Sequence, residues 1–518
     1  MPDSRIFQRR GGRPSEVSVR ARCSGFPACQ TSAGARAWPL LAACLAVFLT
    51  ACSEPQPPWQ SRHTRPASRP GSSAVIVGRG LAAPLASCAA VGCHGRPPQT
   101  AEFPWQSSYA VWLEADPHSG AYDVLYTERS LAIIERLNGG AAGERVSVER
   151  FRQEHCASCH ATTAVGESAE LLAYGVRCDS CHGPADAWLA RHATHAWEAL
   201  PAGEKYAAWR VEPVGEHLDW RLTAEPARMR HTQDLVTQAK VCAECHVGAP
   251  ATATQPAREV DHDLIAAGHP RLNFEFAAYL ANLPAHWDTA KDRQSTERFD
   301  AQAWSIGQLV AAEALVSQVH ARIEDAAAGD ATWPEFAYYD CHACHHALAA
   351  DSYRQRPQRL ASAARDPQPG RLPAGSWQLP FAPLAACGFA VEIQTETDRL
   401  TAELEQLATS SSQLGASCTA ARDALLQAIA QAEHTPLDHQ AQLSELADAL
   451  PDDPDWDLLA QWYLAVLAFT SDAEARPPQL AKLFEGIDFP VYDSPRHYDP
   501  GSFELEEIRT WLRKLATR

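Results

Sequence analysis

Residues 176–185 read VRCDSCHGPA and contain the pattern C-x-x-C-H. The pattern recurs as CASCH at 156–160, CAECH at 242–246 and CHACH at 341–345. A fifth unit, SCAAVGCHG at 87–95, keeps the C-H end but places four residues between its two cysteines. Ten of the 16 cysteines therefore lie in five short units that each contain a Cys-His pair.

The C-x-x-C-H spacing lets two thiols add to the two vinyl groups of one porphyrin, and the next residue, histidine, then binds the iron. Structural zinc sites and disulfides also use paired cysteines, but neither requires histidine directly after the second cysteine. For the first unit, a disulfide or free thiols remain the alternative. We predict five covalently attached hemes c. The predicted attachment cysteines are Cys88, Cys93, Cys156, Cys159, Cys178, Cys181, Cys242, Cys245, Cys341 and Cys344. The predicted proximal iron ligands are His94, His160, His182, His246 and His345.

The charge of the chain is acidic. The 518 residues carry a formal charge of −18, and residues 1–51 contribute +5 to it (seven Arg, two acids). The remainder, −18 − 5 = −23, argues against nucleic acid as a partner.

The N-terminus has the features of an export signal. A basic region ends at Arg36, and the apolar run AWPLLAACLAVFLTAC follows and ends at Cys52. Such a run suits a signal peptide and is short for a membrane span. Residues 49–52 resemble the bacterial lipoprotein box, which predicts a signal peptide over 1–51 and lipidation of Cys52. By that analogy, Ser53 favours a lipid anchor in the outer membrane of a Gram-negative-type bacterium, with the protein in the periplasm. An ordinary signal peptide with a chance cysteine is the alternative.

The rest of the chain divides by composition. Residues 52–82 are rich in Pro, Ser and Gly and predict a flexible tether. Residues 83–350 hold 17 of the 21 histidines and predict the pentaheme domain. Residues 351–385 predict a Pro-rich linker, and 386–518 repeat apolar residues at helical spacing, which predicts a small helical bundle. Five hemes in so short a domain must pack against one another and help to form its core.

The second axial ligand of each iron lies outside the Cys-His units and must come from elsewhere in the chain. Met229 is the only methionine after processing, so at most one heme has a His/Met pair and the others are bis-His or open. From their contexts we predict distal ligands at His118, His192, His262 and His269, with a buried, hydrogen-bonded histidine as the alternative. His192 is preferred over His195, its neighbour on the same helix face. The contexts do not single out His231, His286, His320, His342 or His346, and His155 and His217 read as surface residues.

Several segments together resemble one group of exported multiheme cytochromes c. They are SCAAVGCHG, WLEADPHSGAY, VRCDSCHGPA, CAECHVG, DHDLIAAGHPRLNFEFAAYL and YDCHACHHAL. The group lies near the tetraheme cytochrome c of ammonia oxidisers and hydroxylamine oxidoreductase, and the resemblance covers about 83–350. It implies a mainly helical fold with little sheet, hemes in stacked pairs, and His118 and His269 as distal ligands. The chain differs in having five sites and no C-x-x-C-Lys site, which disfavours the ammonia-forming nitrite reductase type.

Two functions from different classes follow. The first is a lipid-anchored periplasmic carrier that passes electrons along five hemes and docks redox partner proteins through its acidic surface. The second is an oxidoreductase of small nitrogen or sulfur compounds, which needs one heme with an open distal place and acid/base groups such as Tyr174, Asp261 or Asp263. In a third reading the C-terminal bundle docks the cytochrome onto a larger complex. A disulfide between Cys387 and Cys418, the oligomeric state and the physiological donor and acceptor stay open.

Overall fold

The computed structural model describes residues 88–138, 145–163, 169–223, 228–253, 255–296, 298–345, 370–375, 377–389, 393–450, 454, 456–471, 476–487 and 505–517. The predicted signal peptide, Cys52 and the predicted tether lie outside these residues, as does most of the predicted linker. No helix among the described residues combines the length and the apolar composition that a membrane crossing requires.

Short helical turns make up the first part of the described chain. They are η2 (Pro98–Thr100), η3 (Pro104–Ser107), α4 (Ser108–Ala115), η4 (Pro117–Gly120), η5 (Asp123–Tyr126), α5 (Glu128–Leu137), α6 (Val148–Phe151), the π-turn η6 (Arg152–Cys156), α7 (Ala157–His160), α8 (Ala169–Leu172), α9 (Cys178–His182), α10 (Ala185–His192), α11 (His195–Glu198) and α12 (Ala202–Lys205). Two small clusters of buried apolar side chains support them, one around Tyr122 and one around Trp188. So little apolar burial is what a region that packs around large cofactors would show.

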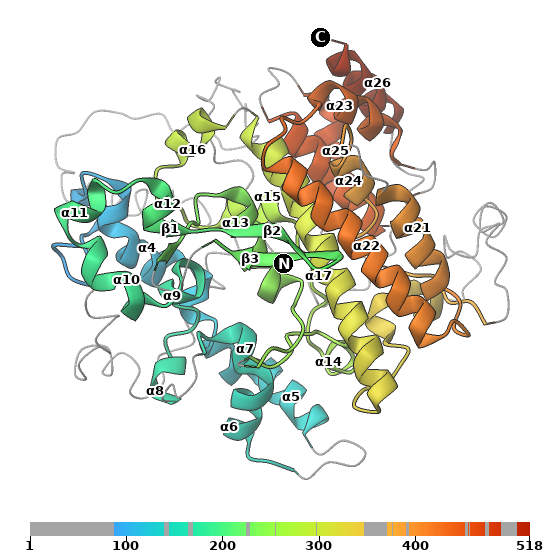
Figure 1. Cartoon of the computed structure of the whole chain (residues 1–518), viewed down its shortest axis with the longest axis horizontal. Helices are drawn as coiled ribbons and strands as arrows, with labels where there is room; N and C mark the ends of the chain where they lie inside the picture. The colour runs from blue at the N-terminus through green and yellow to red at the C-terminus, as the bar shows by residue number, and fades with distance from the viewer. Residues whose placement is uncertain are drawn as a thin grey trace, which may run out of the picture. The chain divides into compact units, whose positions relative to one another are not determined.

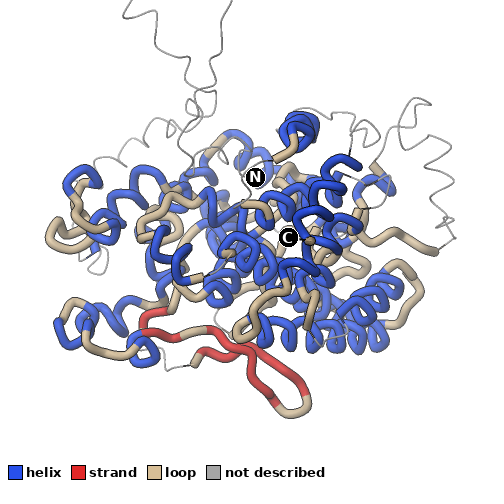
Figure 2. The backbone as a smooth tube through the Cα atoms, turned by 90° about the horizontal axis from the view of Figure 1, so that it is seen from above, coloured by secondary structure: helices blue, strands red, loops and turns tan. Residues whose placement is uncertain are grey.

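The strands are few, as predicted. β2 (Trp209–Val214) and β3 (His217–Leu222) form an antiparallel hairpin that pairs Trp209 with Leu222. β1 (Tyr206–Ala207) and β4 (Met229–Arg230) form a two-residue parallel pair. Figure 2 shows the hairpin, in red, lying along the helices rather than inside them. The prediction of a mainly helical fold with little sheet is confirmed.

A 30-residue helix, α17 (Phe299–Ala328), is the centre of the main core. It is apolar on nearly every side, and Trp304 and Leu309 are fully buried, which is typical of a helix enclosed by others. Around it lie α13 (Leu235–His246), α15 (Phe276–Asn282), α20 (Ala382–Ala385), α22 (Ser411–Ala432) and α24 (Trp456–Phe469). Figure 1 shows α17 and α22 side by side along most of their length.

The remaining elements complete the described structure. They are α14 (His262–Ala266), α16 (Thr289–Ser295), η7 (Phe336–Tyr338), α18 (Cys341–Cys344), α21 (Ile393–Leu404), α23 (His439–Asp448), α25 (Pro478–Ile487) and α26 (Leu505–Ala516). The main core contains side chains between Leu235 and Leu512, among them Trp377 and Leu379 of the predicted linker. Whether the chain divides into separate folding units at 350 and 386 stays a prediction. Side chains from both sides of these boundaries pack in one core.

Candidate heme-binding sites

Each Cys-His unit is held by a compact local structure. We number the units 1 to 5 in chain order, ending at His94, His160, His182, His246 and His345. Units 2 to 5 coincide with α7, α9, the last turn of α13, and α18. One helical turn brings residues i, i+3 and i+4 to one side, so both thiols and the histidine point toward the same space.

Unit 1 reaches a compact shape through a turn rather than a helix. Cys93 donates its backbone N–H to the Ala90 carbonyl at 2.8 Å, and Gly95 donates to the same oxygen at 3.1 Å. A side chain at Gly95 would lie 1.9 Å from the Ala89 carbonyl oxygen, so only glycine allows this close approach. The two extra residues of the C-x4-C-H spacing are taken up in this turn.

The structure brings a second histidine opposite each of the five unit histidines. The ring centres are separated by 6.2 Å for His94 and His192, 6.4 Å for His160 and His269, 6.3 Å for His182 and His286, 5.9 Å for His118 and His246, and 6.3 Å for His262 and His345. No histidine serves two pairs. Ordinary aromatic contacts of this structure reach the same separations, so the distinguishing feature is that each of the five unit histidines meets a different histidine from a distant segment.

This separation fits one iron between two imidazoles. A metal–imidazole bond is about 2 Å long and the nitrogen lies about 1.1 Å from its ring centre, so two axial imidazoles have centres about 6.3 Å apart. All five pairs fall within a few tenths of an ångström of that value. Two thiols of the same unit accompany each pair. The residues present therefore fit heme c at all five sites.

Hydrogen bonds to the other ring nitrogen hold six of these rings in orientation. In each, Nδ1 contacts an oxygen, which leaves Nε2 available to bind an iron. The contacts are His94 to Trp105 O (2.7 Å), His118 to Asp116 Oδ1 (2.8 Å), His160 to Ala121 O (3.0 Å), His182 to Thr232 Oγ1 (3.4 Å), His192 to Leu189 O (2.6 Å) and His269 to Pro270 O (2.8 Å). Metal-binding histidines characteristically use their second nitrogen in this way.

Burial keeps several of these imidazoles neutral, as iron ligation requires. It lowers the pKa of His182 and of His246 to about 3, helped by the charge of their partner histidines His286 and His118. Burial also lowers the pKa of His269 to about 4. At His118 burial acts in the same direction, but the hydrogen bond and charge of Asp116 outweigh it, so the pKa of His118 is raised.

All four histidines predicted as distal residues lie in these pairs. His192 faces unit 1, His269 unit 2, His118 unit 4 and His262 unit 5. The fifth partner is His286 at unit 3, which its sequence context does not mark as a ligand. The one sequence feature that could have marked His286 is a proline two residues before it, Pro284, since His118 also follows a proline, Pro117.

The remaining histidines whose side chains the structure describes do not belong to any of the five pairs. His195 and His217 are exposed and contact Glu198 and Asp423. His231 stacks on Tyr206, His155 lies against Phe151, and His320 lies 3.7 Å from Glu324. His346 and the side chain of His342 lie outside the description. Cys387 and Cys418 are both free thiols, and Asp261, named above as a candidate acid, caps α14 by accepting from the Leu264 N–H.

Thiol contacts show which sites are neighbours. Cys88 of unit 1 lies close to Cys178 of unit 3, and Cys159 of unit 2 lies close to Cys245 of unit 4, so that each thiol shifts the pKa of the other. Cys181 of unit 3 is within electrostatic reach of Cys245 in unit 4. The partner residue of unit 5, His262, begins α14, and the partner residue of unit 2, His269, follows the end of that helix and donates its backbone N–H to the Leu264 carbonyl at 3.0 Å. The sites therefore follow one another in the order 1–3–4–2–5.

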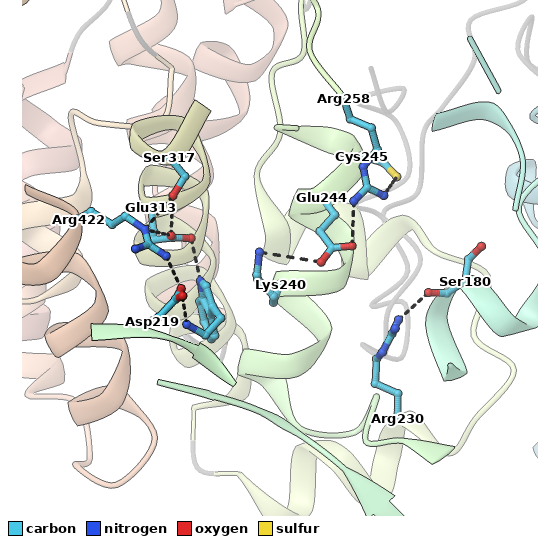
Figure 3. Close-up of polar contacts among 11 residues, drawn as sticks. Ser180, Asp219, Arg230, Lys240, Glu244, Cys245, Arg258, Glu313, Ser317 and Arg422 are labelled. Atoms are coloured by element: carbon cyan, nitrogen blue, oxygen red, sulfur yellow. Dashed lines mark hydrogen bonds and ion pairs between the residues drawn. The ribbon is translucent and has the colours of Figure 1, made fainter. Parts of the chain in front are cut away.

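Arginines line this row of sites (Figure 3). Arg258 places Nη1 3.7 Å from the Cys245 sulfur and Nη2 3.2 Å from Glu244, while Arg230 donates to the Ser180 carbonyl at 2.7 Å. At unit 5, Arg271 Nη1 lies 3.8 Å from the Cys341 sulfur. Positive charge beside the attachment sulfurs stabilises the reduced, less positive state of a bound iron.

Comparison with known proteins supports the same chemistry. A family model described as cytochrome c554 and c-prime matches residues 88–183, which include units 1 to 3 and less than a fifth of the chain. No curated protein and no solved structure matches. The matched segment, together with the repeated Cys-His units, supports a multiheme c-type cytochrome.

Proposed function

We propose that the chain is an exported, lipid-anchored electron-transfer cytochrome with five hemes c in the cell envelope. The observation that carries this proposal is the set of five histidine pairs, each with ring centres 5.9 to 6.4 Å apart and each beside two thiols. Heme c supplies a one-electron ferric–ferrous couple when bound.

The residues have separable roles in this proposal. The ten unit cysteines attach the porphyrins, and the unit histidines bind from one side. His192, His269, His286, His118 and His262 bind from the other side at sites 1, 2, 3, 4 and 5 in that order. If both histidines of each pair bound the iron, no coordination place would be left for a substrate, which favours a carrier over an enzyme.

The order of the sites also supports electron transfer. A row 1–3–4–2–5 gives each site one or two neighbours and makes sites 1 and 5 the two ends. Such a row connects two separate surfaces, as a carrier between a donor and an acceptor requires. Residues 1–52 support placement of the protein in the periplasm on a lipid anchor at Cys52.

Mass spectrometry and iron spin state test the proposal. The mature protein is expected to carry five heme masses and a diacylated N-terminal cysteine, and its electron paramagnetic resonance spectrum should contain low-spin ferric signals only. The reduced protein should not bind carbon monoxide. Four hemes would remove site 1, and a high-spin heme that binds carbon monoxide or nitrite would favour the oxidoreductase instead.

A further inference from the structure

We propose that site 5 is the surface on which a redox protein with a basic face docks. This inference rests on the proposed electron-transfer function and assigns one end of the row to a partner of defined chemistry. The surface consists of the exposed part of unit 5, the ring of Phe336, and the carboxylates of residues 259–265 and 322–345.

Unit 5 is one of two sites open to solvent. Of the ten attachment cysteines, only Cys93 of unit 1 and Cys344 of unit 5 are exposed, and His345 is exposed beside Cys344. These two units are the ends of the row. An electron that enters or leaves through a protein partner therefore has two points of close approach.

An aromatic side chain extends site 5 outward. Phe336 is 49% exposed, and its ring meets the His262 ring edge-on with centres 5.8 Å apart. An exposed aromatic ring in contact with an iron-binding residue is a suitable centre for an interface, because apolar contacts there bring the partner close to the cofactor.

Charge defines the kind of partner. The stretches 259–265 and 322–345 contain eight carboxylates and a single cation, Arg322. They meet in space because Arg322 pairs with Glu259 at 2.9 Å and with Glu335 at 3.0 Å, and α14 lies beside the C-terminal end of α17 (Figure 1). Those two ion pairs occupy the only cation of these stretches, and Arg271 beside unit 5 pairs with Asp457. The exposed carboxylates Asp263, Glu324, Asp325 and Asp330 therefore give the surface a negative field.

The other end of the row has a different character. Residues 88–107 and 185–205, which carry unit 1 and its partner His192, together hold four carboxylates and three cations, with Phe103 and Trp105 about half exposed. A partner steered by its positive charge would therefore reach site 5 in preference to site 1.

Binding of a basic single-heme cytochrome c to the mature holoprotein tests the inference. The site 5 variant combines Glu324→Gln, Asp325→Asn and Asp330→Asn, three exposed residues that contact no proposed ligand. Its matched control combines Glu102→Gln, Glu198→Gln and Glu204→Gln, which are exposed residues from the part of the chain around site 1 and remove the same charge. Calorimetric titration at about 0.01 M and about 0.5 M salt separates electrostatic attraction from apolar contact. The Debye length falls from about 30 Å to a few ångströms between these two conditions, so only the electrostatic part of the binding is screened.

At low salt the site 5 variant is expected to bind the probe on the order of tenfold more weakly, and the control to change by less than about twofold. The difference should vanish at high salt, and a succinylated, acidic form of the probe should not bind. Equal losses in both variants, or salt-independent binding, would overturn the inference. Failure of the wild type to bind, in a protein that holds five low-spin hemes, would overturn the docking surface and leave the proposed function intact. A preparation without hemes would overturn both.

Discussion

His286 completes the axial pair of site 3, and replacing it isolates one iron. His286→Ala should leave five hemes attached, because the thioether bonds come from cysteines, but should convert one of the five from low spin to high spin. The reason is that site 3 loses its second nitrogen ligand while His182 keeps its own. Electron paramagnetic resonance and carbon monoxide binding to the reduced protein measure this change.

His195→Ala is the matched control for that experiment. Its side chain is fully exposed and belongs to no pair, so all five irons should stay low-spin. If His286→Ala also keeps five low-spin hemes, another residue binds at site 3 and the assignment of His286 is wrong.

For single residues, the sequence predicts which cysteines and histidines attach a heme better than it predicts which distant histidine lies opposite each unit. The C-x-x-C-H units identify their own cysteines and histidines because the chemistry acts within five residues. Distal partners lie much further away in the chain, between 83 residues (His262 to His345) and 128 residues (His118 to His246). Which distant histidine meets which unit depends on how the turns between them pack. A neighbouring proline or glycine marks some candidates, but it does not specify their partner.

At the scale of elements, α15 and α17 approach so closely that one position requires glycine. A Cβ at Gly307 would lie 2.4 Å from the Cβ of Phe276, inside the contact distance of two carbons. Gly307→Ala should therefore lower the free energy of unfolding by about 1–3 kcal/mol, because the two helices must move apart: the position of the Phe276 Cβ is fixed by its backbone, so no rotamer change relieves the contact. Urea unfolding followed by tryptophan fluorescence measures the loss.

Gly415→Ala in α22 provides the comparison. The nearest atom to its added Cβ is His320 Nε2 at 3.6 Å, which is ordinary contact. This variant should be neutral or gain up to about 1 kcal/mol, since alanine is the better helix former. Similar losses at both positions would mean that helix packing at Gly307 is not the cause.

Helices of the C-terminal region are predicted well from sequence because their apolar spacing is regular, and α22, α24 and α26 coincide with the amphipathic stretches. The hairpin β2–β3 is harder to predict. Its strands are half-exposed, and their pairing depends on a tight turn at Gly215, whose φ of +66° glycine adopts without strain. A single glycine in a polar stretch does not distinguish a hairpin from a loop.

At the scale of the whole molecule, the C-terminal helices are joined to the heme-bearing region through α17. A buried carboxylate on α17, Glu313, receives Arg422 of α22 at 3.0 Å, and the Trp220 indole N–H of the hairpin at 2.9 Å. Arg422 also pairs with Asp219 at 2.6 Å. Figure 3 shows this cluster, in which the hairpin, α17 and α22 meet. Composition suggests separate domains here, but it does not reveal that one polar cluster and one core cross the junction.

Arg422→Ala tests whether the two regions unfold together. The change leaves the Glu313 carboxylate buried without its cation, which should cost about 3 kcal/mol even though Trp220 and Ser317 still donate to it. Because the core is shared, the low-spin heme spectrum and tryptophan fluorescence should lose their native signals at the same urea concentration, lower than in the wild type. Arg150→Ala, which removes an exposed pair with Glu154, should shift that concentration little, since such pairs contribute less than about 1 kcal/mol. Two separate transitions, with the heme spectrum unchanged in Arg422→Ala, would instead show that residues 386–518 fold as an independent domain.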